Sequence, residues 1–259
     1  MRLLEKPKKQ SLSFITLCIK EGFSLFNSER QFWLMTSSCC CGIFLLSTIL
    51  FVTVFSVSLI TMFLLTVLQF ALAGLLFSYF ADECCGKKME LSHLPNHLLR
   101  YFKDSNFWLF VVFFFCVKLL ITQLLMMTIA DIPQNIDPSN ITKEELIKIN
   151  IETLKISGIS LIFEYYFFWS VVPLMSILPQ EKVFILMRRT WHSGRINIIS
   201  SAGLFLFLIG MLILGFEIAS LLAKILPLLG LLGFLLFISA YLPFAAAIVF
   251  RAVRHIYIE

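Results

Sequence analysis

Residues 31–81 read QFWLMTSSCCCGIFLLSTILFVTVFSVSLITMFLLTVLQFALAGLLFSYFA. This stretch of 51 residues holds no Asp, Glu, Lys or Arg, and it lies between Arg30 and Asp82. A helix of roughly 20 apolar residues crosses a bilayer core that is about 30 Å thick. The stretch is too long for one crossing and long enough for two. It therefore predicts a pair of transmembrane helices, over about 35–55 and 58–80.

The composition of the whole chain indicates the same class of protein. Of its 259 residues, 59% are hydrophobic and 14% are charged, whereas soluble domains carry about 25% charged residues. A backbone exposed to lipid must satisfy its own hydrogen bonds, and long apolar runs do so as helices. We expect an all-α, polytopic integral membrane protein that forms a single transmembrane domain over 1–259.

The rest of the chain repeats one unit, an amphipathic segment followed by two apolar runs. The amphipathic segments are 11–30, 82–106 and 180–196, and they predict helices that lie at the membrane interface. The further apolar runs predict helices over about 107–130, 156–178, 197–222 and 226–250. The fold expected is six transmembrane helices arranged as three hairpins. Phe32-Trp33-Leu34 recurs as Phe107-Trp108-Leu109, which either an internal repeat or chance agreement in a Phe-rich sequence explains.

The distribution of positive charge predicts the orientation in the membrane. Of the 21 Lys and Arg residues, 16 lie on the side of the amphipathic segments and the two termini, and 4 lie on the opposite side. Short loops rich in Lys and Arg stay in the cytoplasm, so both termini are expected there. No cleavable signal peptide is expected at the charged start of the chain. The seven cysteines lie near the cytoplasmic side or within a span, so no structural disulfide is expected.

Lys118 and Glu164 are a candidate polar pair inside the membrane. Each lies well within a predicted span, where an ionisable group costs at least about 2.5–3.5 kcal/mol and normally faces a partner or a wet cavity. With 1.5 Å of rise per residue, their depths differ by roughly 6 Å, which two long side chains can bridge. One interpretation is a site for a substrate or a proton path between the third and fourth helices. The other is an ion pair that fixes how these helices pack.

Other patterns give little indication of chemistry. His93 and His97 have the i, i+4 spacing of two metal ligands on a helix, but no third ligand has suggestive spacing, and Pro95 stands between them. The chain has no glycine-rich phosphate loop, CxxC, HExxH or GxSxG motif. We therefore expect no catalytic, cofactor-binding or metal site, and no nucleic-acid partner. Asn140 opens an Asn-Ile-Thr glycosylation sequon in the predicted outer loop.

Three motifs resemble a known group of proteins. They are Phe167-Phe168-Trp169 with Val172-Pro173-Leu174, then Arg188-Arg189-Thr190-Trp191 with Arg195-Ile196-Asn197, and finally Phe250-Arg251 with Arg254-His255-Ile256. The chain resembles poorly characterised bacterial six-helix inner-membrane proteins, which are related to the membrane domain of some glycerophosphodiester phosphodiesterases. The sequence holds no stretch expected to form a soluble catalytic domain. The resemblance thus implies a fold and an inner-membrane location, and it carries over no activity.

Three hypotheses of function remain open at this stage. The first is a non-enzymatic membrane module that organises lipid or other membrane proteins, which the interface segments favour. The second is a small transporter or carrier with a polar site at Lys118 and Glu164, next to the helix break expected at Pro173. The third, an enzyme acting on lipid, has no residue set to support it. Water access to Lys118 and Glu164 distinguishes the first two.

Overall fold

We describe the protein from a computed structural model, which describes residues 3–4, 6–56, 58–128, 151–152, 155–156, 158–160 and 169–258. In this part of the chain the regular structure is helical, apart from one isolated β-bridge between Leu3 and Ile258. The elements in chain order are α1 (Ser13–Ser28), α2 (Arg30–Phe55), α3 (Leu59–Cys84), η1 (Leu91–His93), α4 (Leu94–Lys103), α5 (Ser105–Thr128), α7 (Val171–Ile177), α8 (Val183–Ile196), α9 (Ile198–Ile225) and α10 (Pro227–Tyr257).

Five of these helices, α2, α3, α5, α9 and α10, are long and apolar enough to cross a membrane. They contain 24 to 31 residues, whereas a bilayer core about 30 Å thick is crossed by roughly 20. The chain is therefore an all-α, multi-pass membrane protein, as its composition predicts. The amphipathic segments also form helices: α1 lies within 11–30, α4 within 82–106 and α8 within 180–196.

Several long helices extend beyond their predicted ends into charged sequence. The helix predicted over 35–55 begins at Arg30, and the one predicted over 226–250 continues to Tyr257. Charged side chains do not break a helix, since Lys, Arg and Glu are among the better helix formers. The apolar run therefore marks only part of each helix.

Gly86 follows the end of α3, and its backbone conformation terminates the helix. Its φ of 70° lies in the left-handed region, which glycine adopts at little cost. The Gly86 N–H donates to the Glu83 carbonyl at 2.9 Å, and the Lys87 N–H donates to the Asp82 carbonyl at 3.0 Å. These two bonds form a Schellman motif, which satisfies carbonyls at the end of the helix.

The helix predicted over 156–178 is not continuous in its described part. Residues 158–160 are helical, Trp169 and Ser170 form a turn, and α7 begins at Val171. Pro173 explains the break, because a proline ring clashes with the carbonyl four residues earlier, which here belongs to Trp169. The described break thus lies ahead of the expected position, and α7 itself contains Pro173.

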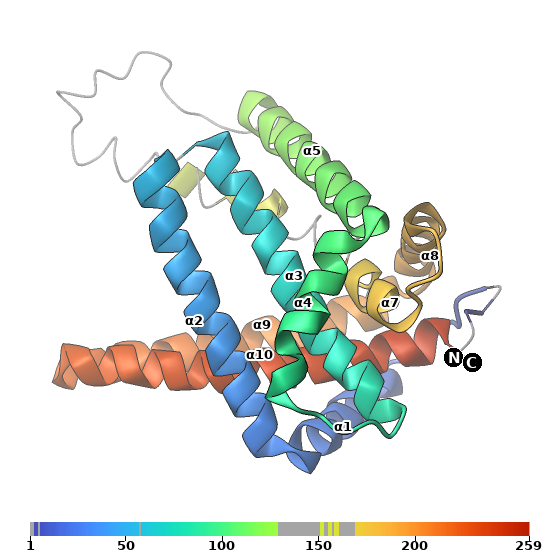
Figure 1. Cartoon of the computed structure of the whole chain (residues 1–259), viewed down its shortest axis with the longest axis horizontal. Coiled ribbons are helices and arrows are strands. Elements are labelled where there is room, and N and C mark those ends of the chain that lie inside the picture. The colour runs from blue at the N-terminus through green and yellow to red at the C-terminus, as the bar shows by residue number, and fades with distance from the viewer. Residues whose placement is uncertain are drawn as a thin grey trace.

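Each long helix is buried mainly at one end. The buried side chains of α2, α5 and α9 lie mostly in the first half of the helix, and those of α3 and α10 mostly in the second half. The first half of α10, by contrast, exposes large apolar side chains such as Leu231 and Leu236. Figure 1 shows α9 and α10 crossing α2 and α3 at a steep angle. The tightly packed core therefore sits at one end of the helix bundle.

Polar contacts join the chain segments at this packed end. α1, α4 and α8 lead directly into the first turns of α2, α5 and α9, and α3 and α10 end there. We call residues 3–30, 82–104, 180–197 and 251–258 the charged face. Hydrogen bonds join its segments to one another, among them Ser28 Oγ to Glu83 Oε1 (2.6 Å), Arg254 to Cys84 Sγ (3.5 Å) and His255 Nε2 to Glu21 Oε2 (2.9 Å). Another joins the Val183 N–H to Asn106 Oδ1 in the first turn of α5 (3.4 Å).

Candidate functional site

The N-terminal segment 3–10 crosses the charged face and is held there by backbone hydrogen bonds. The Lys8 N–H donates to the Ile256 carbonyl at 2.9 Å. The Asn197 side chain also binds the segment. Its Oδ1 accepts a hydrogen bond from the Gln10 N–H at 2.7 Å, and its Nδ2 donates one to the Lys8 carbonyl at 3.0 Å. The segment is thus fixed between the end of α10 and the junction of α8 with α9, and Figure 1 shows the N-terminus beside the end of α10.

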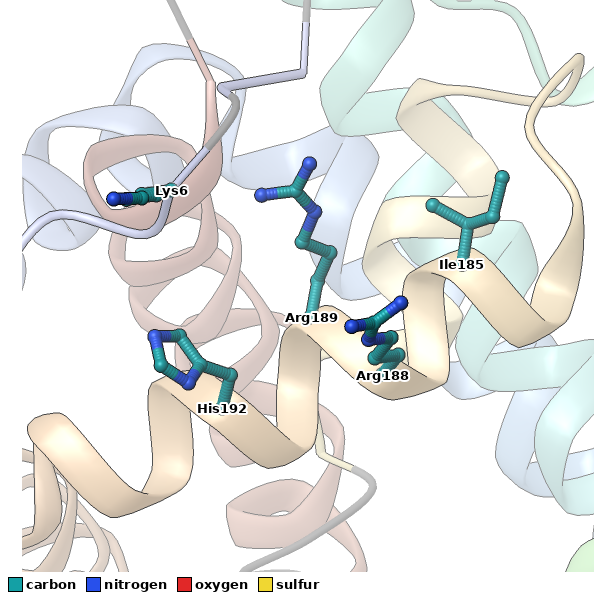
Figure 2. Close-up of a pocket in the computed structure, with 5 residues that line it drawn as sticks. All are labelled: Lys6, Ile185, Arg188, Arg189 and His192. Carbon is teal, nitrogen blue, oxygen red and sulfur yellow. The ribbon is translucent and has the colours of Figure 1, made fainter.

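A basic pocket of about 400 Å³ lies between this segment and α8. Its described lining residues are Lys6, Ile185, Arg188, Arg189 and His192. Figure 2 shows Lys6 on one side and the four α8 side chains along the other, with the Arg189 guanidinium extended between them. No acidic side chain appears among the described residues that line it. We call this cavity the basic pocket.

The sequence of α8 explains how these side chains come together. Residues 188, 189 and 192 follow residue 185 by three, four and seven positions, so all four lie on one face of the helix. The opposite face is buried through Val183, Leu186, Thr190 and Ser193. The Ser170 hydroxyl lies 3.0 Å from both Thr190 Oγ1 and Tyr257 Oη, which ties α8 to the end of α10.

A second cavity, of about 300 Å³, lies beside the end of α10 and contains charges of both signs. Its lining residues are Lys8, Glu21, Arg251, Arg254, His255 and Ile258. His255 Nε2 lies 2.9 Å from Glu21 Oε2, and this contact is an ion pair when the histidine is protonated. The Glu21 carboxylate therefore balances part of the positive charge of this cavity, whereas no described acidic side chain lines the basic pocket.

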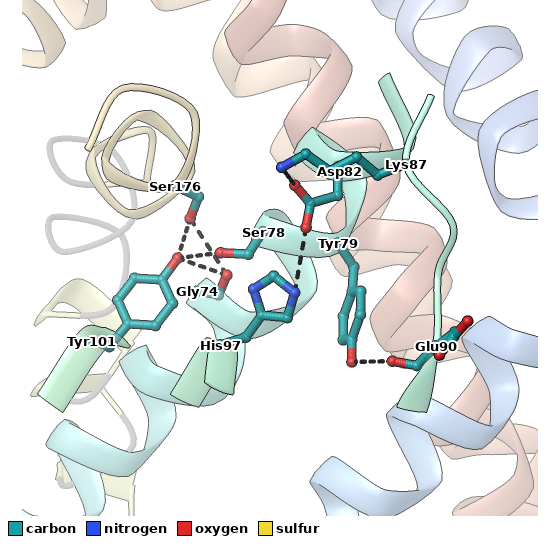
Figure 3. Close-up of polar contacts among 9 residues, drawn as sticks. All are labelled: Gly74, Ser78, Tyr79, Asp82, Lys87, Glu90, His97, Tyr101 and Ser176. Carbon is teal, nitrogen blue, oxygen red and sulfur yellow. Dashed lines mark hydrogen bonds and ion pairs between the residues drawn. The ribbon is translucent and has the colours of Figure 1, made fainter. Parts of the chain in front are cut away.

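A buried hydrogen-bond network holds α4 and α7 against α3. The Tyr101 hydroxyl donates to the Gly74 carbonyl at 2.8 Å, and it lies 2.8 Å from Ser78 Oγ and 2.5 Å from Ser176 Oγ (Figure 3). Burial raises the pKa of Tyr101, so the phenol stays protonated and donates. A Cβ at Gly74 would lie 2.6 Å from the Tyr101 ring. The network therefore has a structural role, because it fixes how α4 and α7 pack against α3.

Replacing Tyr101 by Phe tests this network. We expect Tyr101→Phe to lower the free energy of unfolding by about 1–3 kcal/mol, because it leaves the buried Gly74 carbonyl and two serine hydroxyls with fewer partners. The measurement is a denaturant titration of the purified protein in detergent micelles. Tyr241→Phe is the matched control, since the Tyr241 hydroxyl donates to the Leu208 carbonyl in a partly buried hydrogen bond. Equal losses in both variants would contradict the role of the network.

His97, one of the two histidines considered as metal ligands, lies beside a carboxylate. His97 Nε2 lies 3.3 Å from Asp82 Oδ2, and Asp82 also pairs with Lys87 at 2.9 Å (Figure 3). Burial lowers the pKa of His97 more than the Asp82 carboxylate raises it. Within the described ranges, no group of three His, Cys, Asp or Glu side chains is placed to hold a metal ion.

Of the candidate intramembrane pair Lys118 and Glu164, the structure describes only Lys118. Lys118 lies half-buried in the second half of α5. Glu164 lies outside the described residues, as does Asn140 of the sequon. The pairing of Lys118 with Glu164 therefore stays a prediction.

All seven cysteines are free thiols, and their environments differ sharply. Cys18 is fully buried in α1, and burial raises its pKa to about 12. Since the thiolate is the reactive form, we expect a maleimide at pH 7.5 to label the exposed Cys85 readily and Cys18 only after unfolding. Mass spectrometry of labelled peptides, with and without denaturant, measures this. Rapid labelling of Cys18 in the folded protein would show that α1 does not pack as described.

Comparison with known proteins adds no relative: no family model, no curated protein and no solved structure matches the chain.

Proposed function

We propose that the protein is a non-enzymatic, membrane-organising module of the cell (inner) membrane, with six transmembrane helices in three hairpins and both termini in the cytoplasm. The observation that carries this proposal is the one-ended packing of the bundle. The helices are tightly packed and linked at the charged face, while their other ends offer apolar side chains to lipid or to other membrane proteins.

The pairing of the two chain ends supports a sixth crossing. Leu3 forms a β-bridge with Ile258, and the Lys8 N–H bonds to the Ile256 carbonyl, so the ends lie on the same face. Termini on one side of a membrane require an even number of crossings. Five candidate spans are described, and the predicted helix over 156–178, which includes α7, supplies the sixth.

The charge distribution supports the orientation. The charged face carries most of the Lys and Arg residues of the chain, and segments rich in these residues stay in the cytoplasm. The three interface helices also fit this placement. Each exposes large apolar side chains near charged ones, as Phe23 of α1, Phe102 of α4 and Phe184 of α8 do.

A lipid-shell measurement tests the organising role. The full chain is extracted with its surrounding lipid in polymer-bounded discs, and the lipid is compared with that of the bulk membrane. We expect anionic phospholipid to be enriched around the protein, because basic segments near a membrane surface attract it at about 1 kcal/mol per residue. A shell with the bulk composition would overturn the organising role with respect to lipid.

Solute flux distinguishes the alternative, a small transporter or carrier. Its support is Lys118, a basic side chain half-buried within a candidate span. Vesicles that hold the purified protein should be as tight to small ions and polar solutes as protein-free vesicles. Flux that is present with the wild-type chain and lost with Lys118→Met would replace the module with a carrier.

A further inference from the structure

We propose that the basic pocket binds the phosphate of an anionic phospholipid from the cytoplasmic leaflet. This inference rests on the proposed function for its placement of α8 at the membrane interface. It goes further by assigning one binding site and one ligand class to named residues, the pocket formed by Lys6, Arg188, Arg189 and His192.

The charge of the pocket requires an anionic ligand. Lys6, Arg188, Arg189 and His192 line one cavity, and no ion pair or hydrogen bond of their side chains is found within the described part of the chain. Like charges around one cavity repel one another, and an anion in the cavity would relieve that repulsion. Two guanidinium groups favour phosphate in particular, because their planar forks donate two parallel hydrogen bonds to its oxygens.

The pocket is also built in advance of any ligand. Asn197 and the end of α10 hold the segment that carries Lys6, and the buried face of α8 fixes the helix that carries the other three side chains. Holding the backbone of a site in place beforehand lowers the conformational entropy that is lost on binding. The cavity of about 400 Å³ falls within the range of roughly 300–1,000 Å³ that is usual for small-ligand sites.

The surroundings of the pocket favour a lipid over a soluble phosphate. Ile185 lines the cavity itself, and Phe184 and Trp191 of the same helix are 59% and 47% exposed. Exposed aromatic side chains of this kind sit at the headgroup level of membranes. α8 also ends at Ile196, and only Asn197 separates it from the start of the span α9 at Ile198. A headgroup in the pocket would thus have its acyl chains beside apolar side chains.

The second cavity provides an internal contrast. It contains Arg251, Arg254 and Lys8, but Glu21 lies among them and contacts His255 at 2.9 Å. A phosphate there would face a carboxylate. We therefore assign the lipid to the basic pocket alone.

Lipid titration followed by native mass spectrometry tests the proposal. The full chain in neutral detergent is titrated with phosphatidylglycerol, and in parallel with phosphatidylcholine of the same acyl chains. We expect one phosphatidylglycerol molecule to bind at least tenfold more tightly than phosphatidylcholine. Arg188→Gln with His192→Gln, both at exposed positions, should abolish that preference. Arg188→Lys with Arg189→Lys should keep the charge and lose the forked hydrogen bonds, so the preference should fall to an intermediate value.

A matched control separates the pocket from general surface charge. Lys88→Gln with Lys103→Gln removes two exposed positive charges from the same face, outside the pocket, and it should leave the preference unchanged. Wild-type affinity in the Arg188/His192 variant, or an equal loss in the control, would overturn the proposal. Displacement of the bound lipid by millimolar inorganic phosphate would instead identify a free-phosphate site.

The same variants keep this inference distinct from the proposed function. If the Arg188/His192 variant loses its single tight lipid but still enriches anionic lipid in its shell, the organising role stands and the pocket is assigned. If the shell is enriched and the wild-type chain holds no tight lipid, only the pocket assignment is wrong. Retained thermal stability of each variant confirms that it folds.

Discussion

Replacing Trp33 by Ala is expected to lower the free energy of unfolding by about 3–5 kcal/mol, the usual cost of deleting a fully buried aromatic side chain. Trp33 has no exposed surface, and its ring stacks on that of Phe80 with centroids 3.9 Å apart and an interplanar angle of 23°. The change removes contacts between α2 and α3 where the bundle is most tightly packed. Titration of the purified protein from a mild to a denaturing detergent measures the loss.

Trp108 provides the matched control, because it occupies the same place in the repeated Phe-Trp-Leu motif at the start of α5. Its side chain is 37% exposed, and its indole N–H donates to the Phe102 carbonyl at 2.8 Å. Trp108→Ala should therefore cost only about 1 kcal/mol, mainly the lost hydrogen bond. Similar costs for the two tryptophans would show that the packed core does not lie where the structure places it.

Replacing Gly22 by Leu is expected to detach α1 from α10. A Cβ at this position would lie 2.6 Å from Ile248 Cγ1 and 2.9 Å from two backbone atoms of Ile248. Backbone cannot move aside as a flexible side chain can, so even one added carbon forces the helices apart. Overpacking of this kind typically costs about 1–3 kcal/mol, and the longer leucine side chain places the effect at the upper end. The buried Cys18 thiol, one turn away, should then become reactive to maleimide.

Gly42→Ala is the control for Gly22→Leu, and it is expected to change the stability in the opposite direction. It lies inside α2, and nothing stands within 4 Å of the position its Cβ would take. Gly42→Ala should raise stability by about 0.5–1 kcal/mol, because alanine loses less conformational freedom in a helix than glycine does. Destabilisation by Gly42→Ala, or tolerance of Gly22→Leu, would contradict the described packing.

The membrane class and the helical elements could be predicted because they depend on local properties of the sequence. An uninterrupted apolar run specifies a span, and alternation of apolar and charged residues at helical spacing specifies an interface helix. Pro95 illustrates this, since a proline suits the first turn of a helix, and it stands at the start of α4. Pro173 also predicts a break in the helix over 156–178, but the sequence does not show that the chain turns at Trp169 and Ser170, ahead of the proline.

The candidate site could not be predicted in the same way, because it joins residues that are distant in the chain. Arg188 and Arg189 were recognised as part of a basic interface segment, but nothing in the sequence brings Lys6 to them. That contact depends on Asn197, whose side chain binds a segment 189 positions earlier. Tyr101 likewise reads as one apolar position among several in α4, and its partner Ser176 lies 75 residues away. Such pairings follow from how the helices pack.

We propose that the charged face lies in the cytoplasm and that each long helix runs from it across the membrane. Single cysteines introduced as Lys88→Cys and Asn140→Cys, in a chain without its native cysteines, test this with a membrane-impermeant maleimide. The account predicts that position 140 is labelled in intact cells and position 88 only in inside-out vesicles. Labelling of both positions from the same side of the membrane would contradict it.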